Sequence, residues 1–168
     1  MISALTWDKT HIMTASMDDI DRKILAELQN DGTLSVDSLS ERVNLSRNAC
    51  WRRVKRMEDD GVIKGRVALV DAEMVGYGLS VFILVRTSAH DPEWLNKFRA
   101  AVARFPEIVG AYRMTGDLDY VLKARISDVR AYDRLYQRLI ACVPLSDVSA
   151  SFVMEEIKDT TAVPLDGR

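Results

Sequence analysis

The densest group of chemically active side chains lies between Ser46 and Arg66. Seven cations occur there against three acids, a net charge of +4, although the whole chain carries a formal charge of −2. The cations are Arg47, Arg52, Arg53, Lys55, Arg56, Lys64 and Arg66. A basic island in an acidic protein can attract phosphate groups, but a run of charges is also the ordinary solvated face of a helix. The elements around the island must therefore decide between these interpretations.

The same stretch predicts a helix whose two faces differ in chemistry. Ser46 is suited to cap it, and Cys50, Val54 and Met57 recur at i, i+4 and i+7 as a buried stripe. Gly61 ends the helix. The opposite face carries Arg47, Asn48, Trp51, Arg52 and Lys55.

The outward residues have distinct uses on a DNA duplex. Arg47 and Asn48 lie in the first turn, where arginine can pair bidentately with guanine and asparagine with adenine. Trp51 can cover a thymine methyl group or pack against the preceding helix. Other side chains suit phosphate contacts, which fix register without reading sequence. These are Arg52, Lys55 and Arg56, together with the hydroxyls of Ser35, Ser38 and Ser46.

Two further helices are predicted ahead of this one. Asp18 or Asp19 can cap the first, and Asp31-Gly32 ends it. Ser35 can cap the second, which a tight turn at Asn44-Leu45 follows. Two capped helices joined by a tight connection, the second with its cations outward, are typical of a helix-turn-helix. The segment after it, Val62–Leu69, predicts a strand or wing.

The chain beyond Gly76-Tyr77-Gly78 predicts a second unit. Strands are indicated over Ser80–Thr87, Ile108–Met114, Leu118–Ile126 and Asp147–Ile157, with helices opening at Asp91-Pro92 and Asp128 and closed by Pro106 and Pro144. The order βαββαβ is that of a ferredoxin-like unit, whose two helices cover one face of a four-stranded sheet. We expect two copies to pair their uncovered sheet faces across a two-fold axis.

Composition excludes several classes of protein. With 48% apolar and 29% charged residues among 168, the chain should fold as one ordinary domain or two small ones. Cys50 and Cys142 form no CxxC pair, so neither a disulfide framework nor a structural zinc site is expected, and a reducing cytoplasm fits best. No window approaches the ~20 apolar residues of a membrane span. Residues 1–16 are expected to be a flexible extension without a basic leader.

Several segments together resemble the Lrp/AsnC family of amino-acid-responsive transcription regulators. They are MDDIDRKILAELQNDG, LSERVNLSRNACWRRVKRMEDDGVIKG, RMTGDLDYVLKARI and FVMEEIK, and the resemblance runs from about Met17 to Pro164. It implies an α+β protein with an N-terminal winged helix-turn-helix, a linker strand and a C-terminal ferredoxin-like βαββαβ ligand-sensing domain. It also implies homodimers that assemble into octamers. The segments CWRRVKRMEDDG, YRMTG and TTAVPL are most similar to a subgroup that senses L-cysteine and controls its degradation.

The resemblance directs attention to the hairpin Gly116–Tyr120 as an amino-acid sensor. An α-amino acid needs acceptors for its ammonium group and backbone or hydroxyl donors for its carboxylate. Asp117 and Asp119 can supply the former, and Gly116 lets backbone N–H groups approach the latter. Without the resemblance, the residues alone favour a plain turn with Tyr120 in the core. The candidate effector residues are Thr115, Gly116, Asp117, Asp119, Tyr120, Ser149 and Ser151.

These observations predict a cytoplasmic regulator that binds double-stranded DNA and a small amino acid, needs no cofactor or metal and catalyses no reaction. The expected parts are residues 17–66 (winged helix-turn-helix), 67–78 (linker strand) and 79–160 (effector binding and oligomerisation). One alternative is a ferredoxin-like enzyme of the dimeric α/β-barrel kind. Such an enzyme needs a nucleophile or a general base on its sheet face, but the one histidine and the one cysteine of the C-terminal half, His90 and Cys142, both lie off the predicted strands. Another is an architectural DNA binder of the same family with little sequence preference.

Overall fold

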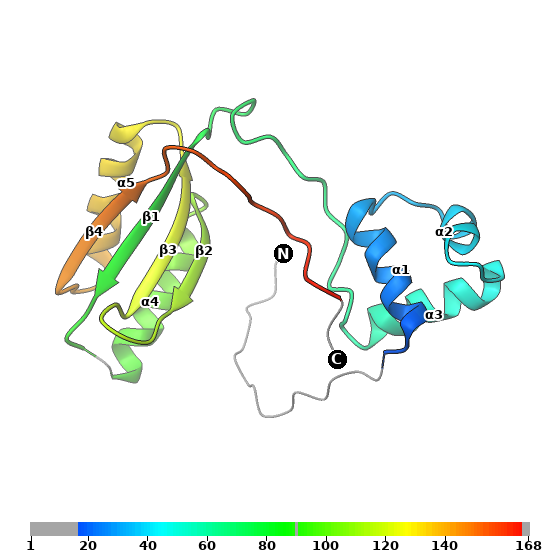
Figure 1. Ribbon diagram of the computed structural model, residues 1–168. Coiled ribbons are helices and arrows are strands. Elements are labelled where there is room, and N and C mark those ends of the chain that lie inside the picture. The colour runs from blue at the N-terminus through cyan, green and yellow to red at the C-terminus, as the bar shows by residue number, and fades with distance from the viewer. Residues whose placement is uncertain (1–16, 90, 166–168) are drawn as a thin grey trace. The chain divides into compact units, whose positions relative to one another are not determined.

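A computed structural model describes residues 17–89 and 91–165 (Figure 1). The expected flexible extension, residues 1–16, lies outside the described residues, as does His90. The chain divides into two compact units, one made of residues up to Ala68 together with the tail from Asp159, the other of Leu69–Lys158. Among the described residues, no helix is long and apolar enough to cross a bilayer.

The first unit is built from three capped helices, as the sequence predicts. They are α1 (Asp19–Asn30), α2 (Val36–Arg42) and α3 (Arg47–Asp59). The side chains of Asp18, Ser35 and Ser46 each accept a hydrogen bond from the backbone N–H three residues later. Asn44, at φ +56°, makes the tight connection between α2 and α3, because asparagine tolerates the left-handed region better than most side chains.

The apolar stripes of the three helices meet in one small core. Ile24 of α1, Leu39 of α2 and Cys50 and Met57 of α3 are almost completely buried in it. Burial raises the pKa of the Cys50 thiol, which keeps it in the neutral form of a small hydrophobe. The predicted inward face of α3 is therefore confirmed.

A buried carboxylate ties α1 to α3. The side chain of Asp21 is 1% exposed, and its two oxygens lie 2.9 Å from an Arg53 nitrogen and 2.5 Å from an Arg56 nitrogen. Arg53 also contacts Asp18 at 2.7 Å. Since α1 and α3 are short, two charge-assisted contacts from consecutive turns of α3 fix the rotation of one helix against the other.

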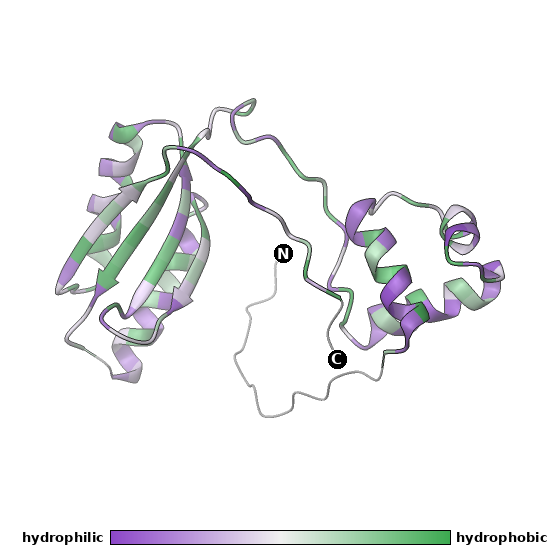
Figure 2. Ribbon diagram, viewed as in Figure 1, coloured by the Kyte–Doolittle hydropathy of each residue, from purple (hydrophilic) through white to green (hydrophobic). Residues whose placement is uncertain are grey.

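The second unit is a four-stranded antiparallel sheet with two helices on one face. Its strands are β1 (Leu79–Arg86), β2 (Ile108–Arg113), β3 (Tyr120–Ile126) and β4 (Asp147–Phe152), in the order β2-β3-β1-β4. Helices α4 (Pro92–Arg104) and α5 (Val129–Cys142) pack on it. Figure 2 shows β1, at the centre of the sheet, as mainly apolar. The predicted α+β, ferredoxin-like order is confirmed.

One face of the sheet supplies the core of this unit. Val81, Ile83 and Val85 of β1 and Leu122 and Ala124 of β3 are all buried. Alternate residues of the same strands point to the other face, which no described helix covers. The structure thus has the uncovered sheet face that was predicted for a four-stranded sheet with two helices on one side.

Two strand predictions need correction. The last strand ends at Phe152 and not at Ile157, because Phe152 pairs with Val81 and β1 begins only two residues earlier, at Leu79. Met154, beyond that end, is 97% exposed. Residues 62–78 also form no strand within the described chain, although a wing and a linker strand were expected there. No described segment pairs with them in a ladder, and Asp71 instead folds the chain into a turn by accepting from the N–H groups of Glu73 and Met74.

Replacing Asp21 should expose the importance of the buried carboxylate. In Asp21→Asn the volume is kept, but Arg56 loses its anion and Arg53 keeps only Asp18. We expect the free energy of unfolding to fall by about 2 kcal/mol, less than for a fully buried pair, because both arginines are partly exposed. Urea denaturation followed by circular dichroism measures this. Asp37→Asn, which alters an exposed acid, is the control. An unchanged urea midpoint in Asp21→Asn would contradict this role.

The Asp18 cap should make stability sensitive to acid. The N–H of Asp21 and the Arg53 guanidinium lower the pKa of Asp18 below its usual 3.8. A carboxyl with a lowered pKa stabilises the folded state above its unfolded value, and that contribution is lost as the pH falls through the folded value. The wild type should therefore lose more stability than Asp18→Ser, which caps without titrating, between about pH 6 and about pH 3. Equal losses in urea titrations of the two proteins would refute this.

Candidate functional site

Helix α3 presents the face opposite its buried stripe to solvent. Arg47, Asn48 and Arg52 are exposed, and the Trp51 side chain is 54% exposed. An exposure of that size argues against packing of Trp51 on α2. Opposite this face lie the buried Cys50, Val54 and Met57, so the core holds the helix by one side only. The arrangement leaves one long polar surface of α3 available to a partner.

The cations of this surface differ in how they are held. Arg47 contacts Asp37 at 2.9 Å, but both side chains are largely exposed, so the pair is weak and exchangeable. Lys55 contacts Asp59 one turn later at 2.6 Å, and this contact raises its pKa. Within the described chain the Arg52 side chain makes no hydrogen bond or ion pair, so its five donors are available to a ligand.

Arg56 lies one turn beyond Arg52 on α3, but unlike Arg52 it is held by an ion pair. Its guanidinium contacts the buried Asp21, although its side chain remains 49% exposed. A phosphate contact from Arg56 would therefore compete with a structural ion pair. Arg53, which faces the same carboxylate, is also committed, and its contacts with Asp18 and Asp21 raise its pKa further.

The three candidate serines are placed at helix starts. Ser35 and Ser46 accept hydrogen bonds from their own helices, and the Oγ atoms of Ser35 and Ser38 lie 3.0 Å apart. A hydroxyl that accepts from the backbone keeps its own proton for a second partner. Helix N-termini also favour anions. Capping and a phosphate contact are thus compatible at these positions.

The predicted hairpin borders a hollow of about 420 Å³ at the end of the sheet. Three predicted effector residues, Thr115, Asp117 and Ser149, line it. Gly116, at φ +97°, makes the turn between them, a conformation that side chains other than glycine seldom adopt. The remaining lining residues are Leu84, Arg86, Met114 and Leu118.

Arg86 is the residue of this hollow that sequence reasoning missed. Its Nε donates to the backbone oxygen of Asp117 at 2.9 Å, and its Nη1 lies 3.0 Å from the Asp147 carboxylate. The guanidinium therefore fastens the hairpin to β1 and β4 while bordering the hollow. The sequence offered one signal for it, a single arginine at the end of an apolar strand. Because side chains alternate between the two faces of a strand, Arg86 lies on the open face together with Leu84.

The other predicted effector residues lie apart from the lining. Tyr120 belongs to the core: its ring centroid lies 4.6 Å from that of Phe98 and 5.7 Å from that of Trp94. The alternative of a plain turn with Tyr120 in the core therefore fits this residue. Asp119 accepts from the N–H of Thr87 at 2.8 Å, which holds the hairpin against the end of β1. Ser151 belongs to β4 but does not border the hollow.

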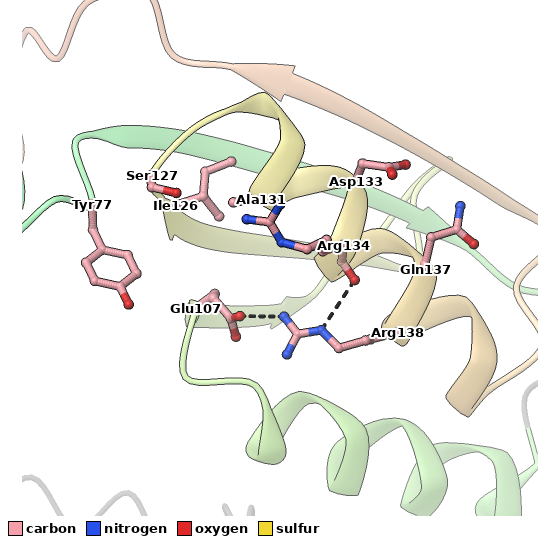
Figure 3. A pocket seen from close by; sticks show the side chains of 9 residues that line it. All are labelled: Tyr77, Glu107, Ile126, Ser127, Ala131, Asp133, Arg134, Gln137 and Arg138. Atoms are coloured by element: carbon pink, nitrogen blue, oxygen red, sulfur yellow. Dashed lines mark hydrogen bonds and ion pairs between the residues drawn. The ribbon is translucent and has the colours of Figure 1, made fainter.

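A larger hollow of about 610 Å³ lies on the helical side of the unit (Figure 3). None of the predicted effector residues lines it. The side chains of Glu107 and Arg138 form an ion pair across it, and Arg138 also donates to the backbone oxygen of Arg134. Among the described residues no group of three potential metal ligands occurs.

Both units match known families. Residues 17–64 match the winged helix-turn-helix DNA-binding model, and residues 80–163 match the Lrp/AsnC ligand binding domain. The chain is 48% identical to the DNA-binding transcriptional activator DecR of Escherichia coli over 89% of its length and 99% of DecR. It is 47% identical to the glutamate uptake regulatory protein of Zymomonas mobilis, over 91% and 93% of the two chains. The L-Met complex of transcriptional regulator NMB0573 from Neisseria meningitidis matches with 38% identity, a TM-score of 0.86 and coverage of 90% and 98%.

An exposed cationic helix on a helix-turn-helix unit, joined to a ligand-binding unit, defines a DNA-binding transcriptional regulator. The chain belongs to the Lrp/AsnC family. The predicted family and the non-enzymatic class are confirmed by these relatives, which are named as regulators. The enzyme alternative is not favoured.

Proposed function

We propose that α3 reads base edges in the major groove of DNA through Arg47 and Asn48. The observation that carries this is the exposed face of α3. Its first turn presents the Arg47 guanidinium, which can form paired hydrogen bonds, and the Asn48 amide, and both side chains are exposed to solvent. Arg47 must leave Asp37 to do so, which costs little because both groups are solvated. Trp51, one turn further on, offers an apolar surface for a thymine methyl group.

Phosphate contacts complete the proposed interface. Arg52 is unengaged, Lys55 can exchange Asp59 for a phosphate, and Ser35, Ser38 and Ser46 can donate from helix starts. We assign Arg56 a smaller part than its position in the sequence suggested, since Asp21 holds it. Such contacts release counterions, so affinity should fall steeply with salt.

The effector in this proposal is a small amino acid bound at the hairpin hollow. Asp117 offers a carboxylate to the ammonium group, while Arg86, Thr115 and Ser149 offer donors to the carboxylate. Apolar side chains of Leu84, Met114 and Leu118 line the same hollow and suit a short, weakly polar side chain. The solved structure of NMB0573 is a complex with L-Met, which supports an amino acid as the ligand class. We propose L-cysteine from the resemblance of CWRRVKRMEDDG, YRMTG and TTAVPL to the cysteine-sensing subgroup.

Assembly through the open sheet face belongs to the same proposal. Tyr112 of β2 is half exposed, and Phe82 and Leu84 of β1 are only partly buried, on a face with no described helix over it. Pairing two such sheets would cover these side chains and place two copies of α3 on one complex. We propose dimers that assemble further into octamers, acting in the cytoplasm.

Two arginine variants test the division between base and phosphate contacts. On a duplex selected by the wild type from a random library, Arg47→Ala should lose about tenfold or more in affinity, with a much smaller loss on random DNA. Arg52→Ala should weaken both alike and reduce the slope of log affinity against log salt by about 1 per contact. Fluorescence anisotropy measures both.

Arg99→Ala is the matched control, because Arg99 is an exposed cation of α4 in the other unit. It should behave as the wild type on both duplexes. Parallel losses of Arg47→Ala and Arg52→Ala on selected and random DNA would overturn the assignment of Arg47 to base reading.

A thermal-shift screen of the twenty amino acids tests the effector site. An effector at about 100 times its dissociation constant adds about 2.7 kcal/mol of stability, which raises the melting temperature by several degrees. Asp117→Ala should abolish that shift, and Asp119→Ala should reduce it by loosening the hairpin. Asp133→Ala, at the larger hollow, is the control and should retain it. Loss of the shift in Asp133→Ala alone would move the effector to the larger hollow.

A further inference from the structure

The carboxyl-terminal segment belongs to the DNA-binding unit and not to the effector unit that precedes it. β4 ends at Phe152, and residues from Asp159 onward group with the three helices. The end of this segment is red in Figure 1. Residues 163–165 contact α1 through three hydrogen bonds and an apolar contact.

Gln29 of α1 holds the segment by its main chain. The Val163 N–H donates to Gln29 Oε1 at 2.7 Å, and Gln29 Nε2 donates to the Val163 oxygen at 3.2 Å. One amide side chain thus satisfies both polar groups of one residue, as a neighbouring strand would. The Val163 side chain is 61% exposed, so recognition here depends on the backbone.

A second contact, two turns away on α1, fixes the direction of the segment. Arg22 Nη1 donates to the Leu165 oxygen at 2.9 Å, and Leu165 packs on the apolar core of the unit. Arg22 and Gln29 are seven residues apart and share one stripe of α1. Because Val163 meets Gln29 and Leu165 meets Arg22, the segment runs antiparallel to α1. Pro164 between them favours the extended form that reaches both contacts.

We propose that this stripe of α1 is a docking surface for the chain's own residues 160–165, and that the docked segment is a second tether between the two units. The chain already passes from Ala68 to Leu69 between the units, and it passes again from Lys158 to Asp159. A unit held by two connections explores fewer orientations than a unit held by one. In the proposed dimer, two copies of α3 would bind the two half-sites of a two-fold DNA site. The restriction raises the effective concentration of the second α3 at its half-site once the first is bound.

The tether role rests on the proposed DNA reading, but the docking does not. Docking is tested first, by hydrogen exchange and mass spectrometry on the full chain without DNA. In Gln29→Ala the Val163 amide loses its acceptor, and its exchange should accelerate by about tenfold or more. Gln137→Ala, an exposed glutamine of α5, is the matched control and should leave that amide unchanged.

A second variant addresses the same contact from the other side. Val163→Pro removes the N–H that donates to Gln29, while an extended backbone still accommodates the ring. Gln29→Ala removes both hydrogen bonds to Val163, so the double variant should release the segment no further than Gln29→Ala alone, measured by the exchange of the amides that remain in residues 160–165. Unchanged protection of this segment in all three variants overturns the docking.

The tether is tested with the duplex selected by the wild type and with the same duplex cut to one half-site. Gln29→Ala should weaken binding to the two-site duplex by about tenfold and leave the single site unchanged. Equal affinities of Gln29→Ala and wild type for the two-site duplex overturn the tether even where exchange confirms docking. If no duplex is selected at all, the proposed DNA reading fails, and the exchange experiment still decides the docking.

Discussion

The contact between the Asp21 carboxylate and two arginines of α3 is the interaction on which the DNA-binding unit depends. The core of this unit is small: within the described chain, seven buried apolar residues from the three helices and the turn after α2 form it. Arg53 and Arg56 reach the same buried carboxylate, and these contacts act with the apolar stripe of Cys50, Val54 and Met57 to fix which face of α3 is turned inward. The polar face of α3 is exposed as a consequence. A recognition helix needs this arrangement, because only side chains held in a fixed rotation can meet base edges in register.

This use of charge divides the basic island into two functions. Arg53 and Arg56 neutralise an internal acid, whereas Arg52 has no described partner and Arg47 has one that solvent can replace. The net charge of +4 therefore overstates the charge available to DNA. The division also explains why an acidic protein can bind an acidic polymer: the free cations are few, but they are concentrated on one helix face.

Local signals predicted most of the fold. Caps at Asp18, Ser35 and Ser46, and proline at the start of α4, set the helix starts, while alternation along β1 and β3 set the sheet faces. Strand lengths were less predictable, because a strand continues only while a neighbour lies opposite. The apolar residues after Phe152 and those of residues 62–78 resemble strands in composition, yet no described segment pairs with them there.

The sites were predictable where a residue acts through its own turn or helix face, and not where it acts through a distant contact. The outward face of α3 and the turn at Gly116 follow from spacing. Arg86 is missed because its partners, Asp117 and Asp147, lie 31 and 61 residues away. Gln29 is missed for the same reason, with its partner 134 residues on. Alternation already directed Tyr120 inward, and the resemblance led us to place it in the effector site instead.

We propose that α3 enters the major groove of a DNA duplex with its first turn against the bases. Dimethyl sulfate protection tests this directly, because the reagent methylates guanine N7 in the major groove and adenine N3 in the minor groove. On a duplex selected by the wild-type protein, guanine N7 should be protected at positions one helical turn, or a multiple of it, apart. Protection confined to adenine N3, with every guanine N7 still reactive, would contradict it.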